Sequence, residues 1–121
     1  MIPVTVDLAD VVRPWGSFRV IGQFSGKITV KLVKINPNGR LSLQHHANRD
    51  EEWTLLSGRA TATVGDRQYH LNVGDRTTAY RTWVHRLESD VGAELLEVSY
   101  GDFDEDDIVR ISDDYGRKSP G

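Results

Sequence analysis

The amino-acid sequence predicts an all-β fold, a sandwich or barrel of short strands. Segments rich in Val, Ile, Leu, Thr and Tyr alternate apolar and polar residues, as strands with one buried face do. Turn-forming residues separate these segments at short intervals, and helical periodicity is nearly absent before the last residues. At 121 residues with 38% hydrophobic residues, the chain is long enough for one core, and we expect residues 1–121 to form a single domain.

Each predicted strand is a β-branched or alternating segment that ends at a turn signal. The strands are expected, in chain order, at Phe18 to Gly22, Lys27 to Ile35, Leu41 to Ala47, Glu51 to Ser57, Ala60 to Val64, Arg67 to Asn72, Arg76 to Tyr80, His85 to Ser89 and Ala93 to Tyr100. The turn signals are Asn36-Pro37-Asn38-Gly39, Ser57-Gly58, Gly65-Asp66 and Val73-Gly74-Asp75. A short helix could follow at Asp106 to Tyr115, and Lys118 to Gly121 is expected to fray.

Composition excludes several classes of protein. A formal net charge of −3 leaves no basic stripe for a nucleic-acid backbone, so we expect no nucleic-acid partner. Cysteine is absent, which removes disulfide scaffolds and thiolate metal sites and leaves nitrogen and oxygen as metal ligands. Neither a basic-apolar leader nor an apolar run of membrane-spanning length is present, so we expect no membrane partner and a cytoplasmic location.

Four side chains stand at a spacing that suits a metal site. Gln44 and His46 are two residues apart and leave the same face of a strand, and Glu51 follows after a gap that allows a turn. His85 would arrive from a later strand. We therefore predict one divalent metal bound by Gln44, His46, Glu51 and His85, with zinc favoured and iron, manganese or nickel compatible. The alternative is that both histidines are ordinary, partly buried residues.

Glycines on either side of these ligands extend the pattern, because Gly58 follows Glu51 and Gly74 precedes His85. This arrangement resembles the two motifs of the cupin family, although Gln44 stands where most cupins have histidine. The resemblance implies the cupin double-stranded β-helix, a jelly-roll barrel, here with a short C-terminal tail. Cupins are often dimers, so a homodimer is expected.

Short sequence segments around the metal motif resemble those of the type II mannose-6-phosphate isomerases, and together they extend over nearly the whole chain. The matching segments are Arg13 to Phe18, Leu41 to Gln44, Glu51 to Trp53, Ser57-Gly58, His85 to Glu88, Leu96 to Val98, Asp106 to Arg110 and Asp114 to Arg117. In that family the cupin module commonly follows a nucleotidyltransferase that makes GDP-mannose, and this sequence has no room for one. The resemblance implies a metal-dependent isomerase that interconverts mannose 6-phosphate and fructose 6-phosphate through an enediol.

Such a reaction needs a base as well as a metal that polarises the carbonyl. Glu97 is the first candidate, because it would share an inward strand face with Leu95 and Ser99, where an unpaired charge is costly. Lys31 is the second, since the isomerases also carry a lysine there. Which of them moves the proton is open, and Glu97 could instead be structural, paired with Lys31.

The substrate partner implied by the resemblance is a sugar phosphate. Arg13, Arg110 and Arg117 stand in the matching segments, and their guanidinium groups suit bidentate phosphate contacts. Trp15 is expected against the sugar, whereas Trp53 is more readily explained as core. Arg110 could instead form salt bridges with the acidic tail, and the acidic stretch from Asp102 to Asp107 is interpreted as a solvated loop.

Two other functions compete with the isomerase. One is a different metal-dependent cupin chemistry, such as oxygenation at an iron centre. The other is a non-catalytic sugar-binding cupin, because a fold alone does not fix a function. Segments at both ends of the chain, Arg13 to Gly16 and Asp107 to Arg110, favour the isomerase, since an oxygenase does not need them.

Overall fold

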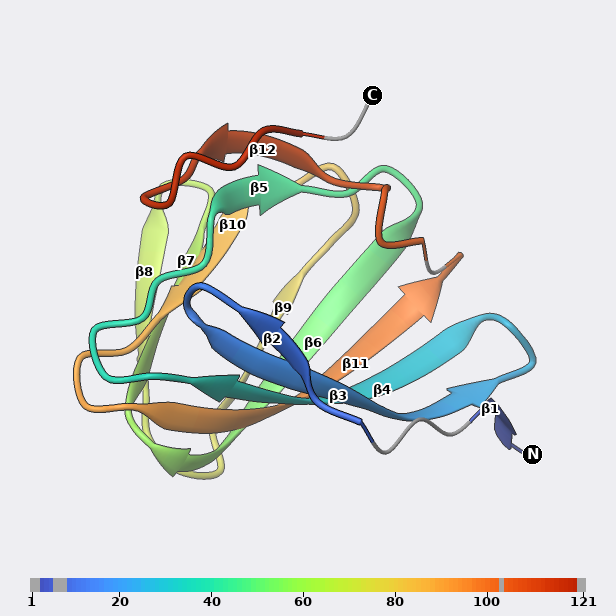
Figure 1. Cartoon of the computed structure of the whole chain (residues 1–121), viewed down its shortest axis with the longest axis horizontal. Helices are drawn as coiled ribbons and strands as arrows, with labels where there is room; N and C mark the ends of the chain where they lie inside the picture. Colours follow the sequence, from blue (N-terminus) through green and yellow to red (C-terminus); the bar gives the residue numbers. More distant parts are fainter. Residues whose placement is uncertain (1–2, 6–8, 103, 120–121) are drawn as a thin grey trace.

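The structure, a computed structural model, describes residues 3–5, 9–102 and 104–119 of the chain. These residues form twelve strands, β1 to β12, and none of them is helical. The strands make two antiparallel sheets that face each other (Figure 1). The predicted all-β fold is therefore confirmed. Within the described residues, no helical segment has the length and apolar character needed to cross a bilayer.

The larger sheet has seven strands in the order β1-β3-β4-β11-β6-β9, with β2 paired to β3 outside this path. Its strands are β1 (Pro3–Thr5), β2 (Val11–Arg13), β3 (Gly16–Phe24), β4 (Ile28–Ile35), β6 (Arg49–Gly58), β9 (Arg76–Ala79) and β11 (Ala93–Gly101). Strand β11 lies at the centre and pairs with β4 on one side and β6 on the other. Strand β11 is therefore hydrogen-bonded to a neighbouring strand along both of its edges.

The smaller sheet has five strands in the order β12-β5-β10-β7-β8. They are β5 (Leu43–His45), β7 (Ala60–Val64), β8 (Arg67–Leu71), β10 (His85–Glu88) and β12 (Val109–Ser112). Strand β10 pairs with β5 and β7, which are far from it in sequence. This pairing places His85, the last residue of the second predicted cupin motif, opposite Gln44, the first ligand of the first motif.

The inward face of the larger sheet changes from apolar to polar along its central strands. The buried residues run from Ile35 and Val33 to Lys31 and Thr29 on β4, from Leu55 and Trp53 to Glu51 and Arg49 on β6, and from Leu95 to Glu97 and Ser99 on β11. The three series are in register, because Leu95 pairs with Val33 and Leu55, and Glu97 pairs with Lys31 and Trp53. One end of the interior is thus an apolar core and the other is a buried polar site.

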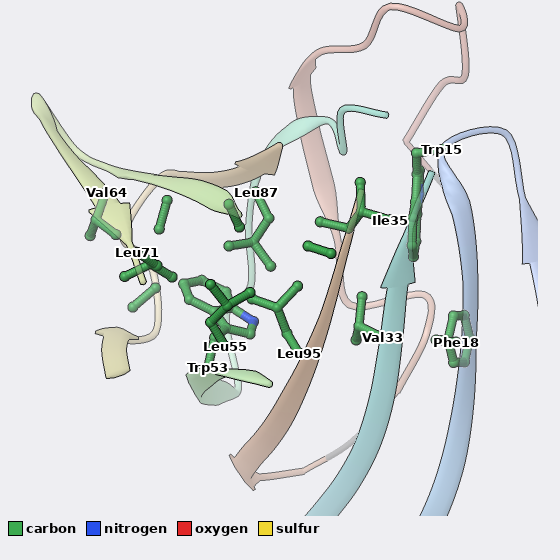
Figure 2. Close-up of a cluster of buried hydrophobic side chains, with 14 residues drawn as sticks. Trp15, Phe18, Val33, Ile35, Trp53, Leu55, Val64, Leu71, Leu87 and Leu95 are labelled. Atoms are coloured by element: carbon green, nitrogen blue, oxygen red, sulfur yellow. The ribbon is translucent and has the colours of Figure 1, made fainter. Parts of the chain in front are cut away.

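Figure 2 shows the apolar core, with Leu55, Leu95 and Leu87 gathered around Trp53. Leu87 comes from β10 of the smaller sheet, and the other three come from the larger sheet. These side chains are at most 1% exposed, so the two sheets are held together by removing their apolar surface from water. Trp53 belongs to this core, as predicted, and does not form a sugar platform.

Each of the nine predicted strands overlaps an observed strand, but the C-terminal segment differs from expectation. The short helix that could lie at Asp106 to Tyr115 is absent, because residues 109–112 form β12 and pair with β5. The expected fraying of Lys118 to Gly121 is wrong for its first half. The Lys118 carbonyl accepts a bond from Arg110 Nη1 at 2.7 Å, and Ser119 Oγ accepts one from the Arg110 backbone N–H at 2.7 Å. Residues 120 and 121 lie outside the described residues.

Candidate metal centre

His46, Glu51 and His85 meet in the buried polar half of the interior. Glu51 Oε1 lies 2.8 Å from His46 Nε2 and 3.1 Å from His85 Nε2. One ligand atom from each of the three residues lies within 4.8 Å of the others, and all three side chains are buried. Two imidazole nitrogens and a carboxylate oxygen match the donor set of catalytic zinc sites and of other first-row metals. This group could therefore bind a metal ion.

Both imidazoles are oriented by backbone carbonyls. His46 Nδ1 donates to the Asp107 carbonyl at 2.6 Å, and His85 Nδ1 donates to the Trp83 carbonyl at 3.0 Å. A carbonyl can only accept, so the proton of each neutral ring is on Nδ1 and the lone pair of Nε2 faces Glu51. Three acceptor atoms then converge on one point, an arrangement that a cation between them stabilises. Fixing a ligating histidine through its other nitrogen is also the usual support of a metal site.

The electrostatics of the three residues agree with this geometry. Burial by itself would raise the pKa of Glu51, but the neighbouring His46 and His85 outweigh it and hold that pKa well below its usual range. Burial by itself would lower the pKa of His85, but Glu51 more than compensates and raises it. In the absence of a metal, the Glu51 carboxylate therefore favours a proton on His85. A divalent ion would displace that proton.

The loop before β10 connects the two histidines through its backbone. The Thr82 N–H donates to the His46 carbonyl at 2.6 Å, and the next residue, Trp83, accepts the His85 bond. Thr82 has a φ of 71°, in the left-handed region that a β-branched residue rarely adopts. Strain of this kind persists where the surrounding contacts fix the backbone, and it is common at functional sites.

Gln44, the fourth predicted ligand, is placed beside the group by strand pairing. It lies opposite His85 on β10 and opposite Arg110 on β12, and it lines the same pocket as His46 and Glu51. Residues directly opposite each other in a sheet present their side chains on one face. Ligation by Gln44 stays a prediction.

Glu97 and Lys31, the two predicted base candidates, are paired neighbours on β11 and β4. Both side chains are buried, and Lys31 Nζ lies 3.8 Å from Glu97 Oε2 and 3.0 Å from Glu105 Oε1. Burial and, after it, the Glu51 charge raise the pKa of Glu97 to about 7, against the opposing effects of Lys31 and the Trp53 indole. The inward position of Glu97 was predicted from strand parity, and the catalytic role of either residue stays a prediction.

A pocket of about 220 Å³ opens onto this polar half. Of the residues predicted for the site, all except His85 line it: Gln44, His46, Glu51, Lys31, Glu97, Arg13, Trp15, Arg110 and Arg117. His85 contacts Glu51, and its ring centre lies 5.2 Å from that of Trp53. The structure thus gathers residues from both ends of the chain at one place.

The three predicted phosphate-binding arginines differ in the hydrogen-bond partners of their guanidinium groups. Arg117 forms a bidentate ion pair with the Asp113 carboxylate, at 3.0 Å from Nε and 2.8 Å from Nη2. Arg110 donates through Nη1 to the Lys118 carbonyl, while its buried Nε has no hydrogen-bond partner among the described residues. Within the described part of the chain, the hydrogen bond of Arg13 is local, from Nη1 to the Val12 carbonyl at 3.1 Å. The alternative that Arg110 pairs with acidic residues of the tail is not seen in its hydrogen bonds.

Arg49 is a pocket residue that the sequence analysis missed. Its buried guanidinium lies 3.4 Å from His46 Nε2 and 3.7 Å from Glu51 Oε2. Arg49 and Glu51 are two residues apart on β6, so strand parity could have placed both inside. Asp107 was also missed, because the stretch from Asp102 to Asp107 was interpreted as a solvated loop, and only long-range contacts reveal its role.

Two facing antiparallel sheets with a His-Glu-His group inside define a cupin. Solved structures agree on the fold: a cupin-2 domain, Rru_A2000 from Rhodospirillum rubrum, matches with a TM-score of 0.66 and 20% identity over 74% of this chain and 62% of that one. KdgF from Halomonas sp. matches with a TM-score of 0.72 and 12% identity over 84% of this chain and 98% of that one.

The chain belongs to the family described as Mannose-6-phosphate isomerase C-terminal, which matches residues 5–113. It is 38% identical over 116 residues to the alginate biosynthesis protein AlgA of Pseudomonas aeruginosa, covering 93% of this chain and 24% of AlgA. Identity is 35% to a mannose-1-phosphate guanylyltransferase of Escherichia coli (89% and 23% covered) and 39% to the xanthan biosynthesis protein XanB of Xanthomonas campestris (88% and 23%). The chain spans about a quarter of the length of these relatives.

These names correct the predicted function. The prediction that this chain interconverts mannose 6-phosphate and fructose 6-phosphate is wrong. Its relatives are named for alginate biosynthesis, xanthan biosynthesis and a guanylyltransferase, and three quarters of each lies outside the match. The family description names the C-terminal part of mannose-6-phosphate isomerase, and a match to that part does not establish independent catalysis. What holds is the coarser statement that the relatives are enzymes of sugar metabolism.

Proposed function

We propose that this chain is a metal-binding cupin module of sugar metabolism whose pocket binds a phosphorylated sugar. The observation that carries the proposal is the position of three arginines, Arg13, Arg110 and Arg117, along the pocket that ends at His46 and Glu51. A ligand with a phosphate at one end and hydroxyl groups at the other matches both parts of such a pocket.

His46, Glu51 and His85 would hold the metal, with Gln44 as the fourth ligand. We propose zinc, because a site with two histidines and one carboxylate is a common catalytic zinc set that leaves a position for a further ligand. Zinc would polarise a sugar oxygen as a Lewis acid. Arg49, which contacts His46 and Glu51, would limit the space around the ion on one side.

Arg110 is the residue we expect to contact the phosphate most directly. Its buried Nε lacks a partner, and a buried donor without a partner is costly unless a ligand satisfies it. Burial lowers the pKa of Arg110, and the nearby Arg117 and Arg13 lower it further, because three cations repel one another. An anion among them would relieve this repulsion.

Other pocket residues would contact the sugar. The Glu97 carboxyl, with its pKa raised to about 7, exists in both protonation states near neutral pH and can donate or accept a bond from a hydroxyl group. Lys31 beside it can only donate. Trp15 and Phe18 supply the apolar wall that the carbon skeleton of a sugar needs. The name of one relative points to mannose 1-phosphate as a probe.

Calorimetric titration tests the proposal. Zinc-loaded and metal-free protein are titrated with mannose 1-phosphate, mannose 6-phosphate and free mannose, after metal analysis of the purified chain. We expect about one metal per chain, and sugar-phosphate binding at least about tenfold tighter than mannose binding, since a charge-assisted hydrogen bond contributes about 1.5–3 kcal/mol. Equal affinity for mannose and its phosphates would contradict the phosphate site. Loss of zinc without any effect on binding would contradict the role of the metal.

A further inference from the structure

The segment between β11 and β12 lies against the pocket. We call residues 104–108 the strap; Glu105, Asp106 and Ile108 of the strap line the pocket. Figure 1 shows it, in dark orange, leading into β12 next to the turn between β5 and β6. The strap is therefore a second boundary of the site, supplied by a part of the chain about 60 residues from the first metal motif.

Asp107 attaches the strap to the residues that follow His46. Its Oδ1 accepts the Ala47 N–H at 2.9 Å and its Oδ2 accepts the Asn48 N–H at 2.9 Å. Each carboxylate oxygen of Asp107 is thus used by one backbone donor, and the two donors come from adjacent residues. A charged acceptor with two parallel backbone donors is a rigid clamp.

The same residue also contacts His46 through its backbone. The Asp107 carbonyl accepts the His46 Nδ1 proton at 2.6 Å, which leaves Nε2 facing Glu51. The bonds of the Asp107 side chain thus keep the backbone carbonyl of the same residue within hydrogen-bond distance of the His46 imidazole. His85 differs, because its carbonyl partner, Trp83, is only two residues away, in the loop that leads into β10.

Two further contacts keep the strap in place. Arg49 Nη1 donates to the Asp104 carbonyl at 2.9 Å, and Lys31 Nζ pairs with Glu105 Oε1 at 3.0 Å. Both partners are buried pocket residues, so the strap contacts the site at three separate points. Of these, only the Asp107 contact involves a metal ligand directly.

We infer that Asp107 is a positioning residue of the metal site: its side chain clamps the strap onto residues 47 and 48 and thereby fixes His46 as a ligand through Nε2. The inference rests on the metal site of the proposed function, and it adds a determinant of metal affinity that lies outside both ligand motifs. Residues that orient ligating histidines typically change metal affinity by about 10- to 100-fold when they are replaced.

The test compares three variants of the whole chain by zinc titration: Asp107→Ala, Asp107→Asn and, as control, Asp66→Ala. The control removes the same charge from an exposed position in the turn between β7 and β8, which does not line the pocket. We expect the zinc dissociation constant to rise by about 10- to 100-fold in Asp107→Ala, to rise less in Asp107→Asn, whose amide oxygen still accepts one bond, and to stay unchanged in the control.

Nuclear magnetic resonance of the imidazole nitrogens gives a measurement that a purely structural role would not change. Metal-free wild-type protein should show His46 protonated on Nδ1, and Asp107→Ala should show a mixture of tautomers at His46 with His85 unaffected. Wild-type zinc affinity in Asp107→Ala, an equal loss in Asp66→Ala, or a wild-type His46 protonated on Nε2 alone would each overturn the inference.

The experiment separates this inference from the proposed function. If wild-type protein bound no zinc, the proposed metal site would fail, whereas the His46 tautomer and its response at position 107 would still decide the positioning role. If Asp107→Ala did not fold, Asp107→Asn and the wild-type tautomer would decide it. Unfolding of each metal-free variant, followed by circular dichroism, establishes which variants are folded.

Discussion

The indole Nε1 of Trp53 donates a hydrogen bond to Glu97 Oε1 at 2.9 Å, at the boundary between the apolar core and the polar site. Both side chains are buried, and the two residues face each other across β6 and β11. The largest core side chain therefore satisfies one oxygen of the buried carboxyl. Burial and the nearby charge of Glu51 raise the pKa of this carboxyl to about 7, although Lys31, at 3.8 Å, acts in the opposite direction.

Metal-free protein should lose stability as pH rises from about 4.5 to about 7. Burial raises the pKa of Glu97 from 4.5 to about 7, so in this window the folded state keeps a proton that the unfolded chain releases. Stability is then fully present below the unfolded pKa and falls as pH rises through the folded pKa. Glu97→Gln removes the titrating group, and we expect a flatter dependence of the free energy of unfolding on pH in this range.

Urea unfolding of chelator-treated protein at several pH values measures this effect. Glu94→Gln is the matched control, because Glu94 lies on the same strand with the opposite parity. A pH dependence that is the same in Glu97→Gln and in wild-type protein would show that Glu97 does not titrate in this window. The raised pKa of His85 acts at higher pH, since its stabilisation is lost only as pH rises above the usual histidine value of 6.5.

Replacing a predicted metal ligand should abolish stoichiometric metal binding. His85→Ala removes one of three converging donors, and a lost donor is not easily replaced from elsewhere in a buried site. We expect metal analysis after dialysis to give about one ion per wild-type chain and close to none in the variant. His70→Ala is the control, because His70 is exposed and its ring contacts Thr61. Full metal content in folded His85→Ala would remove His85 from the ligand set.

Arg110→Lys should weaken sugar-phosphate binding although the net charge is unchanged. Lysine keeps the charge but loses the fork of donors that includes the unpartnered Nε. We expect the dissociation constant for mannose 1-phosphate to rise about tenfold or more, by loss of one charge-assisted bond. Arg59→Lys is the control, because Arg59 is exposed and pairs with Asp90 away from this pocket. Equal weakening by both changes would indicate a general effect of arginine and not a phosphate site.

Gly58→Ala should destabilise the fold more than Gly65→Ala. Gly58 has a φ of 77°, and a Cβ there would lie 2.0 Å from the Gly92 carbonyl oxygen. Gly65 has a φ of 60° with open space around it. The left-handed backbone costs an alanine about 1–2 kcal/mol at either position, and overpacking adds about 1–3 kcal/mol at Gly58 alone. Thermal and urea unfolding measure the difference, and equal losses would mean that the β6 end moves freely away from Gly92.

Local sequence was sufficient for most strands because alternation with a period of two is itself the signal of a half-buried strand. The strands that escaped prediction, β1, β2 and β12, have three or four residues each and depend on their partners. At β12, Val109 and Ile111 are β-branched but too few to mark a strand against the acidic residues before them. The unpaired edge of β5 decides the conformation there, and it is about 60 residues away.

Strand parity by itself determined which residues enter the interior of this protein. It placed Gln44 and His46 on one face and Glu97 inside, and the same rule applied to Arg49 would have completed the polar half. What only the tertiary structure decided is which distant groups complete the site: the Asp107 carbonyl beside His46, and Glu105 beside Lys31. These contacts form where the segment between β11 and β12 packs against the rest of the barrel. The alternation of residues along a single strand carries no information about such long-range contacts.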